Sequence, residues 1–216
     1  MQKKAKRDIM SVADMILFFD TETTGLMPGR IIQLTYIMVD ENETKAKNFF
    51  FSVEYIEPSA SAVNGFTVEK LAKLSGGKTF SCDIDEIDDD FHNADLIVAH
   101  NVGFDIKFLM AEFGYQDRRF KYTEEFDTMK FFTPIMKLER TSHHGYKYPK
   151  LTELCEFFDI YPYDITRKVG EIFGDADVAS HDARYDTVAL KLCFDEGAKK
   201  FDKMKEIEAR HLNKEK

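Results

Sequence analysis

The chain has 216 residues and a formal net charge of −9, because 39 residues are Asp or Glu and only 30 are Lys or Arg. This length supports one domain whose apolar core is large enough to fold without disulfides or a structural metal. No apolar run approaches the length of a membrane span, and the acidic balance argues against tight wrapping of duplex nucleic acid. The three cysteines form no CxxC pair, so we expect reduced thiols and a cytoplasmic location.

The first sixty residues predict three strands in succession. The apolar run at residues 15–19 predicts a buried central strand that carries Asp20 at its carboxyl end. Residues 31–39 and 44–56 predict two more strands, and the short turns between them favour an antiparallel meander. Pro58 is expected to end this part of the sheet.

In the rest of the chain, apolar residues recur mainly at helical spacing. Pro134 is expected to bend or end one of the helices. Residues 161–177 resemble an insertion with a short helix around residues 166–173. A meander followed by alternating helices and strands indicates an α/β fold, a mixed sheet flanked by helices, in which the ends of central strands collect functional groups. The sequence predicts a buried strand at residues 95–100 and helices at residues 67–74, 83–92, 102–113, 128–138, 151–158 and 179–194.

We expect one main domain at residues 13–198, because no internal repeat and no linker of domain-separating length is visible. Residues 1–12 predict a basic N-terminal tail, and no apolar signal-peptide stretch follows it. Residues 199–216 are strongly charged and predict a solvated terminal helix or tail.

Three short acidic segments lie far apart along the chain. Their carboxylates suit hard cations such as Mg²⁺ and Mn²⁺. Two such cations side by side stabilise both the attacking and the leaving oxygen of a phosphodiester. The segments are FFDTETTGL at residues 18–26, HNVGFDIKFL at residues 100–109 and HDARYDTVAL at residues 181–190.

The first segment places Asp20 and Glu22 two residues apart, so that an extended backbone puts both side chains on one face. Adjacent carboxylates repel each other unless a cation lies between them. Alone, this pair is more typical of a strand end with solvated acids than of a metal site. Thr23, Thr24 and Gly25 add two hydroxyls and a flexible backbone, which permit close approach to a phosphate or a terminal nucleotide.

The other two segments supply two more acids and a histidine. Asp105 follows a strand on the first turns of a helix, which aims it towards the same edge as Asp20, although an ordinary acid at a helix N-terminus has the same pattern. His100 is expected to order that turn by hydrogen bonds. His181 and Asp186 are five residues apart, so His181 is predicted at or before a helix start while Asp186 points from the helix body. A histidine in this place suits a general base.

Taken together, the three segments resemble the motifs of the DEDDh family of 3′–5′ exonucleases, which includes the DNA polymerase III epsilon-type proofreading subunits and ribonuclease T. The resemblance covers roughly residues 16–194 and implies an RNase H-like fold. It extends to segments between the motifs, namely NGFTVEKL at residues 64–71, FDTMKFF at residues 126–132 and KLTELCEFFDI at residues 150–160.

The resemblance also implies roles for single residues. His181 would be the general base. Asn64 stands where the epsilon-type proofreaders often have a histidine, and Phe66 is expected to wedge against a base. The implied ligands of two divalent metal ions, Mg²⁺ or Mn²⁺, are Asp20, Glu22, Asp105 and Asp186. The candidate substrate-binding residues near the terminal nucleotide are Thr23, Thr24, Asn64, Phe66 and His100.

The leading interpretation is a metal-dependent phosphodiester hydrolase that degrades DNA from its 3′ end and releases nucleoside 5′-monophosphates, with a role in proofreading or repair. Two alternatives remain open: a 3′–5′ exoribonuclease that trims RNA ends, and a non-catalytic nucleic-acid-binding or polymerase-associated module. The expected partner is single-stranded or 3′-end nucleic acid, with DNA favoured over RNA. A DNA polymerase subunit and a second copy of the chain, in a homodimer, are further candidate partners.

The segment TSHHGYKYPK at residues 141–150 is a polar, aromatic loop. It is either a solvated loop or a surface that contacts the substrate strand. If it contacts the strand, replacement of Lys147 and Lys150 is expected to raise KM and to flatten its salt dependence.

Overall fold

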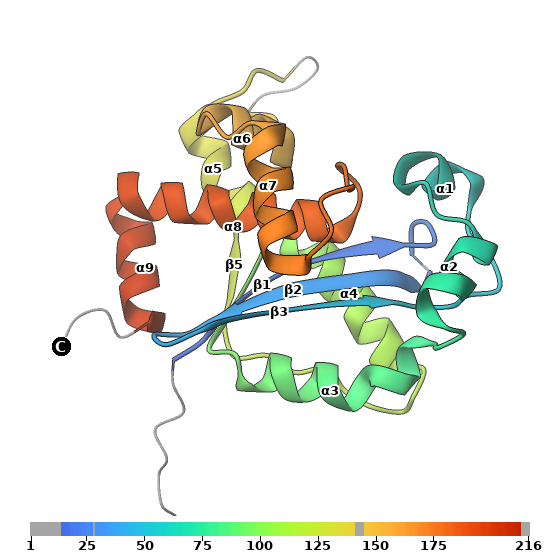
Figure 1. Ribbon diagram of the computed structural model, residues 1–216. Coiled ribbons are helices and arrows are strands. Elements are labelled where there is room, and N and C mark those ends of the chain that lie inside the picture. The colour runs from blue at the N-terminus through green and yellow to red at the C-terminus, as the bar shows by residue number, and fades with distance from the viewer. Residues whose placement is uncertain (1–13, 28, 141–144, 213–216) are drawn as a thin grey trace, which may run out of the picture.

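A five-stranded sheet lies at the centre of the protein, whose structure is a computed structural model that describes residues 14–27, 29–140 and 145–212 (Figure 1). The strand order is β3-β2-β1-β4-β5. β1 pairs antiparallel with β2, β2 pairs antiparallel with β3, and β1, β4 and β5 run parallel. The predicted mixed α/β sheet is therefore confirmed. The strands are β1 (Ile16–Thr23), β2 (Ile31–Val39), β3 (Thr44–Phe50), β4 (Leu96–Ala99) and β5 (Glu125–Asp127).

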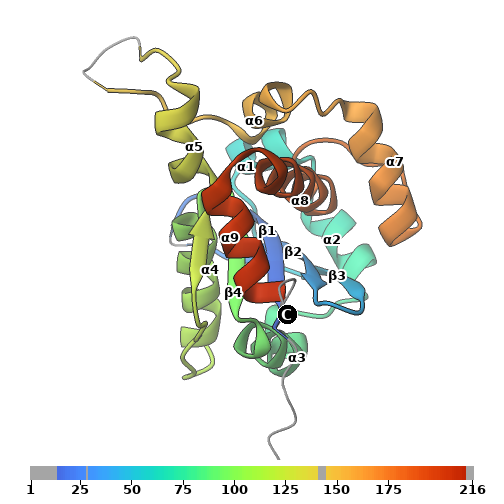
Figure 2. The same ribbon diagram turned by 90° about the vertical axis from the view of Figure 1, so that its left-hand side faces the viewer.

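Helices cover both faces of this sheet. α3 and α4 lie on one face and α8 lies on the other, together with the helices that pack on it (Figures 1 and 2). α1 and α2 lie at one end of the sheet. The helices are α1 (Pro58–Asn64), α2 (Val68–Ser75), α3 (Phe80–Asn93), α4 (Val102–Gly114), α5 (Thr128–Met136), α6 (Leu151–Phe157), α7 (Pro162–Phe173), α8 (Ala183–Lys200) and α9 (Asp202–Leu212).

Strand β1 shows why the central run is apolar on both sides. Ile16 and Phe18 belong to the core on the α8 face, whereas Leu17 and Phe19 belong to the core on the α3 and α4 face. All four side chains are buried, because successive residues of a strand point to opposite faces and both faces are covered. The same alternation decides which face each acid of the first motif reaches.

Several boundaries differ from the sequence predictions. β1 continues to Thr23, so Asp20 lies within the strand and not at its end. β3 stops at Phe50, short of the predicted residue 56. Pro58 occupies the first turn of α1, a helix that the sequence did not predict, because proline is well tolerated there. β5 was also not predicted, since a three-residue strand carries almost no periodicity.

The C-terminal part of the chain is more ordered than predicted. α8 starts at Ala183 and continues through Lys200, across the expected domain boundary at residues 198 and 199. α9 then packs on it and buries Met204, Ile207 and Leu212. The insertion at residues 161–177 forms α7, which is longer than predicted and also packs on α8.

Two predictions fall outside the residues that the structure describes. These are the basic tail at residues 1–12 and residues 141–144 of the polar loop. Among the described helices, none combines the length and the apolar character needed to cross a bilayer.

Candidate active site

The acidic pair of the first motif lies in the second half of β1. Asp20 faces Thr35 across the antiparallel pairing with β2, and Glu22 faces Gln33. Both acids share the face of Ile16 and Phe18, which is the face covered by α8. Burial raises the pKa of Asp20 well above its ordinary value, and the charge of Asp186 raises it further.

Asp186 approaches this pair from the first turn of α8. Burial raises its pKa to about 7, against the hydrogen bond that its Oδ2 accepts from the backbone N–H of His181 at 2.9 Å. Burial, followed by the charge of Asp186, raises the pKa of Glu22 to about 9. One ligand atom each of Glu22, His181 and Asp186 lies within 4.8 Å of the others. Two segments that lie far apart in the sequence therefore contribute two carboxylates and an imidazole to one small volume.

His181 precedes α8, as predicted, and its side chain is exposed. Its backbone has φ 67°, a left-handed conformation that non-glycine residues adopt rarely. It borders a cleft of about 430 Å³ that also reaches α6. The residues that line this cleft are Asp20, His100, Lys150, Leu151, Thr152, Ser180, His181 and Asp186.

Asp105 reaches the same edge of the sheet from the opposite face. It is buried on the first turn of α4, and its Oδ1 accepts hydrogen bonds from the Thr21 hydroxyl at 2.6 Å and from the Thr21 N–H at 3.2 Å. Burial raises its pKa to about 7, although these hydrogen bonds oppose the shift. Its charge in turn raises the pKa of Asp20. Asp105 therefore contributes to the acidic centre while it holds the segment between Asp20 and Glu22 in place.

The donor set fits hard divalent cations. Four carboxylates approach one another at the edge of the sheet, and burial raises the pKa of each of them. Mutual repulsion adds to the shift for Asp20 and Glu22. A divalent cation would remove that repulsion, and oxygen ligands are those that Mg²⁺ and Mn²⁺ prefer. The chemistry of these residues is therefore that of a candidate metal centre.

The two threonines that follow Glu22 shape the next loop. The Thr23 hydroxyl donates to the carbonyl of Gly25 at 2.9 Å, and the Thr24 hydroxyl accepts from the N–H of Arg30 at 2.9 Å. Asn64 donates from Nδ2 to the Thr23 carbonyl at 3.3 Å. A second pocket of about 350 Å³ lies beside this loop, and its lining includes Glu22, Thr23, Gly25, Leu26, Asn64 and Phe104.

Phe66 and His100 are less available than the sequence suggested. Phe66 is only 2% exposed and packs edge-on against Phe50, so its ring has a place in the core and not against a base. The His100 ring uses both nitrogens internally, with Nδ1 at 3.0 Å from the Thr128 hydroxyl and Nε2 at 2.9 Å from the Pro149 carbonyl. Burial lowers the pKa of His100. The ring joins the turn after β4 to the segment before α6, in the ordering role that was predicted.

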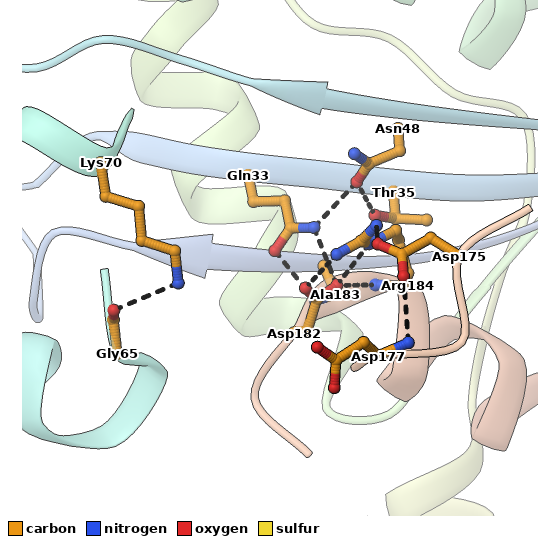
Figure 3. Close-up of polar contacts among 10 residues, drawn as sticks. All are labelled: Gln33, Thr35, Asn48, Gly65, Lys70, Asp175, Asp177, Asp182, Ala183 and Arg184. Carbon is orange, nitrogen blue, oxygen red and sulfur yellow. Dashed lines mark hydrogen bonds and ion pairs between the residues drawn. The ribbon is translucent and has the colours of Figure 1, made fainter. Parts of the chain in front are cut away.

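Sequence reasoning missed a polar network beside His181. Gln33 of β2 bonds to Asn48 of β3 and to the start of α8, where Asp182 and Arg184 form an ion pair (Figure 3). Gln33 gave a visible signal, since it is a polar residue within the apolar run IIQLTYIMV. Its partners on α8 lie about 150 residues away, and no local pattern could name them.

Comparison with known proteins gives one family match. A family model described as RNase_T, Exonuclease, matches residues 17–161. The DNA polymerase III subunit epsilon of Treponema pallidum is 33% identical over 110 residues, which cover 48% of this chain and 49% of that protein. The DNA polymerase III subunit epsilon of Salmonella typhimurium is 29% identical over 154 residues, which cover 67% of this chain and 60% of that protein. The chain thus spans between about half and three fifths of these relatives.

Solved structures share the fold at lower identity. E. coli exonuclease I in complex with a dA16 oligonucleotide gives a TM-score of 0.66 at 17% identity, over 92% of this chain and 43% of that chain. Exonuclease I from Methylocaldum szegediense gives a TM-score of 0.63 at 17% identity, over 88% of this chain and 41% of that chain.

Proposed function

The chain belongs to the RNase T exonuclease family, and from that premise we propose that it removes nucleotides one at a time from the 3′ end of single-stranded DNA. The observation that carries the proposal is the convergence of Glu22 with His181 and Asp186, from opposite ends of the sequence, within 4.8 Å. Asp20 borders the same cleft as His181 and Asp186. Buried carboxylates that repel one another and have raised pKa values cluster at functional sites, which supports the proposal.

Mg²⁺ or Mn²⁺ would be held by Asp20, Glu22 and Asp186, with Asp105 close behind β1. When bound, two such ions neutralise the carboxylates and stabilise the negative charge on the oxygens of the reacting phosphate. Asp105 would contribute through its charge and through its hold on Thr21.

His181 would act as the general base. Its imidazole is exposed at the cleft, within reach of a water molecule beside the acids, and its backbone is fixed by the hydrogen bond to Asp186. In the proposed reaction it takes a proton from the attacking water as the water oxygen bonds to phosphorus. The bond from phosphorus to the 3′ oxygen of the preceding nucleotide then breaks. That oxygen takes a proton from solvent and becomes the new 3′ hydroxyl, and a nucleoside 5′-monophosphate leaves.

DNA is the favoured polymer, because the named relatives are DNA polymerase III epsilon subunits and the solved relative holds a dA16 strand. Trimming of RNA ends is the second candidate, since the matching family model carries the name RNase_T. A polymerase partner is likewise suggested only by the names of the epsilon relatives.

One digestion experiment tests polarity, sugar preference and metal dependence together. Matched single-stranded DNA, mismatched duplex and RNA are labelled at the 5′ or the 3′ end and incubated with Mg²⁺, Mn²⁺ or a chelator. We expect a ladder of shortening products from 5′-labelled DNA, immediate release of labelled mononucleotide from 3′-labelled DNA, and no digestion with chelator. A ladder from the 3′-labelled strand would reverse the polarity and contradict the proposal.

A further inference from the structure

Gln33 is a buried amide in the strand next to the acids. It lies on β2 directly opposite Glu22 in the antiparallel register, and it is 0% exposed. A buried amide is tolerated when its hydrogen-bonding groups find partners. The partners of Gln33 therefore show which segments of the chain it connects.

The partners of Gln33 are at the start of α8 and on β3. Its Oε1 accepts the N–H of Ala183 at 3.1 Å, and its Nε2 donates to Asp182 Oδ1 at 3.0 Å and to Asn48 Oδ1 at 2.8 Å (Figure 3). The Ala183 N–H is only a donor, which fixes the orientation of the amide. The Thr35 hydroxyl donates to the same Asn48 oxygen at 2.6 Å and holds that partner in turn. Both hydrogens and the oxygen of Gln33 are therefore engaged.

Asp182 is the point at which this network meets the helix. It is the N-cap of α8 and accepts the N–H of Arg184. The Arg184 guanidinium also donates to both Asp182 oxygens, at 2.9 and 2.7 Å. A further hydrogen bond of 3.0 Å joins Arg184 to Asp175, at the other end of the segment that leads to His181. Arg184 thus joins the two ends of the segment at residues 175–184, and Gln33 bonds this segment to β2.

His181 is the residue immediately before this anchored pair. Its left-handed backbone is unfavourable for a side chain with a Cβ and persists only where neighbouring contacts hold it. Those contacts are the bond from its own N–H to Asp186 and the two bonds from Gln33 to Asp182 and Ala183. Gln33 is therefore a direct side-chain link between the strand pair that carries Glu22 and the two residues that follow His181.

We propose that Gln33 is a positioning residue for hydrolysis, whose amide keeps the His181 imidazole beside Glu22 and Asp186 by holding Asp182 and Ala183. This inference rests on the proposed function, because it takes His181 as the general base. A purely structural amide would affect stability and leave the kinetics of the folded protein unchanged. A positioning amide affects kcat more than KM, because the imidazole acts on the attacking water and not on the binding of the strand.

The sharpest variant is Gln33→Glu, which keeps the shape and the acceptor for the Ala183 N–H. It removes the donor to Asp182 and places two carboxylates face to face. We expect kcat to fall about 10–100-fold, as for other residues that orient catalytic groups, with KM for a single-stranded oligonucleotide nearly unchanged.

Gln33→Met tests the link without an added charge. It removes the acceptor for the Ala183 N–H and the donors to Asp182 and Asn48, and we expect a similar fall in kcat. Gln116→Glu adds the same charge at an exposed residue just after α4. It is the matched control for Gln33→Glu and is expected to behave as the wild type.

A second readout does not depend on activity. Amide hydrogen exchange of the metal-free protein, followed by NMR, is expected to show faster exchange of the Ala183 and His181 N–H groups in Gln33→Met, which lacks the acceptor for the Ala183 N–H. Because Gln33→Met adds no charge, it also provides the kinetic test if Gln33→Glu does not fold.

The outcomes separate the two proposals. Wild-type kcat in folded Gln33→Glu, or wild-type kcat and amide protection in folded Gln33→Met, would overturn the positioning role. Failure of the wild type and of Gln116→Glu to digest any labelled strand would instead refute the proposed function. In that event, unchanged exchange at Ala183 and His181 would overturn the link, and faster exchange would support it.

Discussion

The Oδ2 atom of Asp186 accepts the backbone N–H of His181 at 2.9 Å. A candidate metal ligand thereby fixes the backbone of the candidate general base, five residues before it in the chain. Substitutions at either position consequently probe two properties, the charge of the carboxylate and the geometry of the loop, and the variants below are chosen to separate them.

Asp186→Asn removes the charge and keeps an oxygen that can accept the His181 N–H. We expect exonuclease activity to be abolished, because a carboxylate ligand is lost. The melting temperature of the metal-free protein is expected to stay the same or to rise, since one of the mutually repelling charges is gone. Asp195→Asn on the same helix is the control, because Asp195 pairs with Lys191 and does not line the cleft. Substantial activity of Asp186→Asn would contradict its role as a ligand.

His181→Ala removes the imidazole and leaves every carboxylate in place. We expect kcat to fall by about 10²–10⁴-fold, the range typical of a lost general base, while KM changes little. Steady-state kinetics from acid to alkaline pH would measure both the loss and the altered profile. His92→Ala, an exposed histidine on α3, is the matched control. A pH–rate profile identical in shape to that of the wild type would count against proton transfer by His181.

The stability of the metal-free protein is expected to fall as the pH rises from about 5 to about 9. The pKa values of Asp105 and Asp186 are raised to about 7, and that of Glu22 to about 9, each chiefly by burial. Between these values and about 4, where unfolded carboxyls titrate, the folded protein binds more protons than the unfolded chain. Stability from these groups is therefore complete below about pH 4 and is lost as the pH passes about 7 and approaches about 9.

Melting temperatures in chelator at about pH 5, 7 and 8.5 would test this dependence. Added Mn²⁺ is expected to raise the melting temperature most at the highest of these pH values, because a cation that binds only the folded state stabilises it by mass action. Glu22→Gln is expected to show a smaller loss across the alkaline part of the range in chelator. A metal-free melting temperature that rises across this range would contradict the raised pKa values of these carboxyl groups.

Lys150 and Lys147 are expected to differ, although they belong to one loop. Lys147 forms an ion pair with Glu153, whereas Lys150 borders the cleft beside Asp20 and His181 and has no ion-pair partner among residues 14–27, 29–140 and 145–212. Lys150→Ala should raise KM and reduce its logarithmic salt slope by about 0.7, the value for one phosphate contact on a single strand. Lys147→Ala, the matched control, should change KM less. Equal effects of the two substitutions would refute a specific contact by Lys150.

Local patterns predicted the parts of the site that follow from strand and helix geometry. Asp20 and Glu22 could be predicted to share a face, because they are two residues apart in a strand. His181 could be predicted to precede α8, because its five-residue spacing from Asp186 does not place both side chains on one face of a helix. The burial of Phe66 was not predicted, because an aromatic residue in a short segment has no periodicity that separates a core position from a stacking surface. Gln33 could be noticed, but its contacts with Asp182 exist only once β2 and α8 pack together.

The two-sided burial of β1 restricts how the length of this segment can vary. Leu17, Phe19 and Thr21 face α3 and α4, while Phe18, Asp20 and Glu22 face α8. Insertion or deletion of one residue between Phe18 and Asp20 would turn both carboxylates towards the apolar layer beneath α3 and α4. Natural variants of this protein should therefore gain or lose residues only after the irregularity that follows Glu22, where the chain leaves the regular pairing with β2.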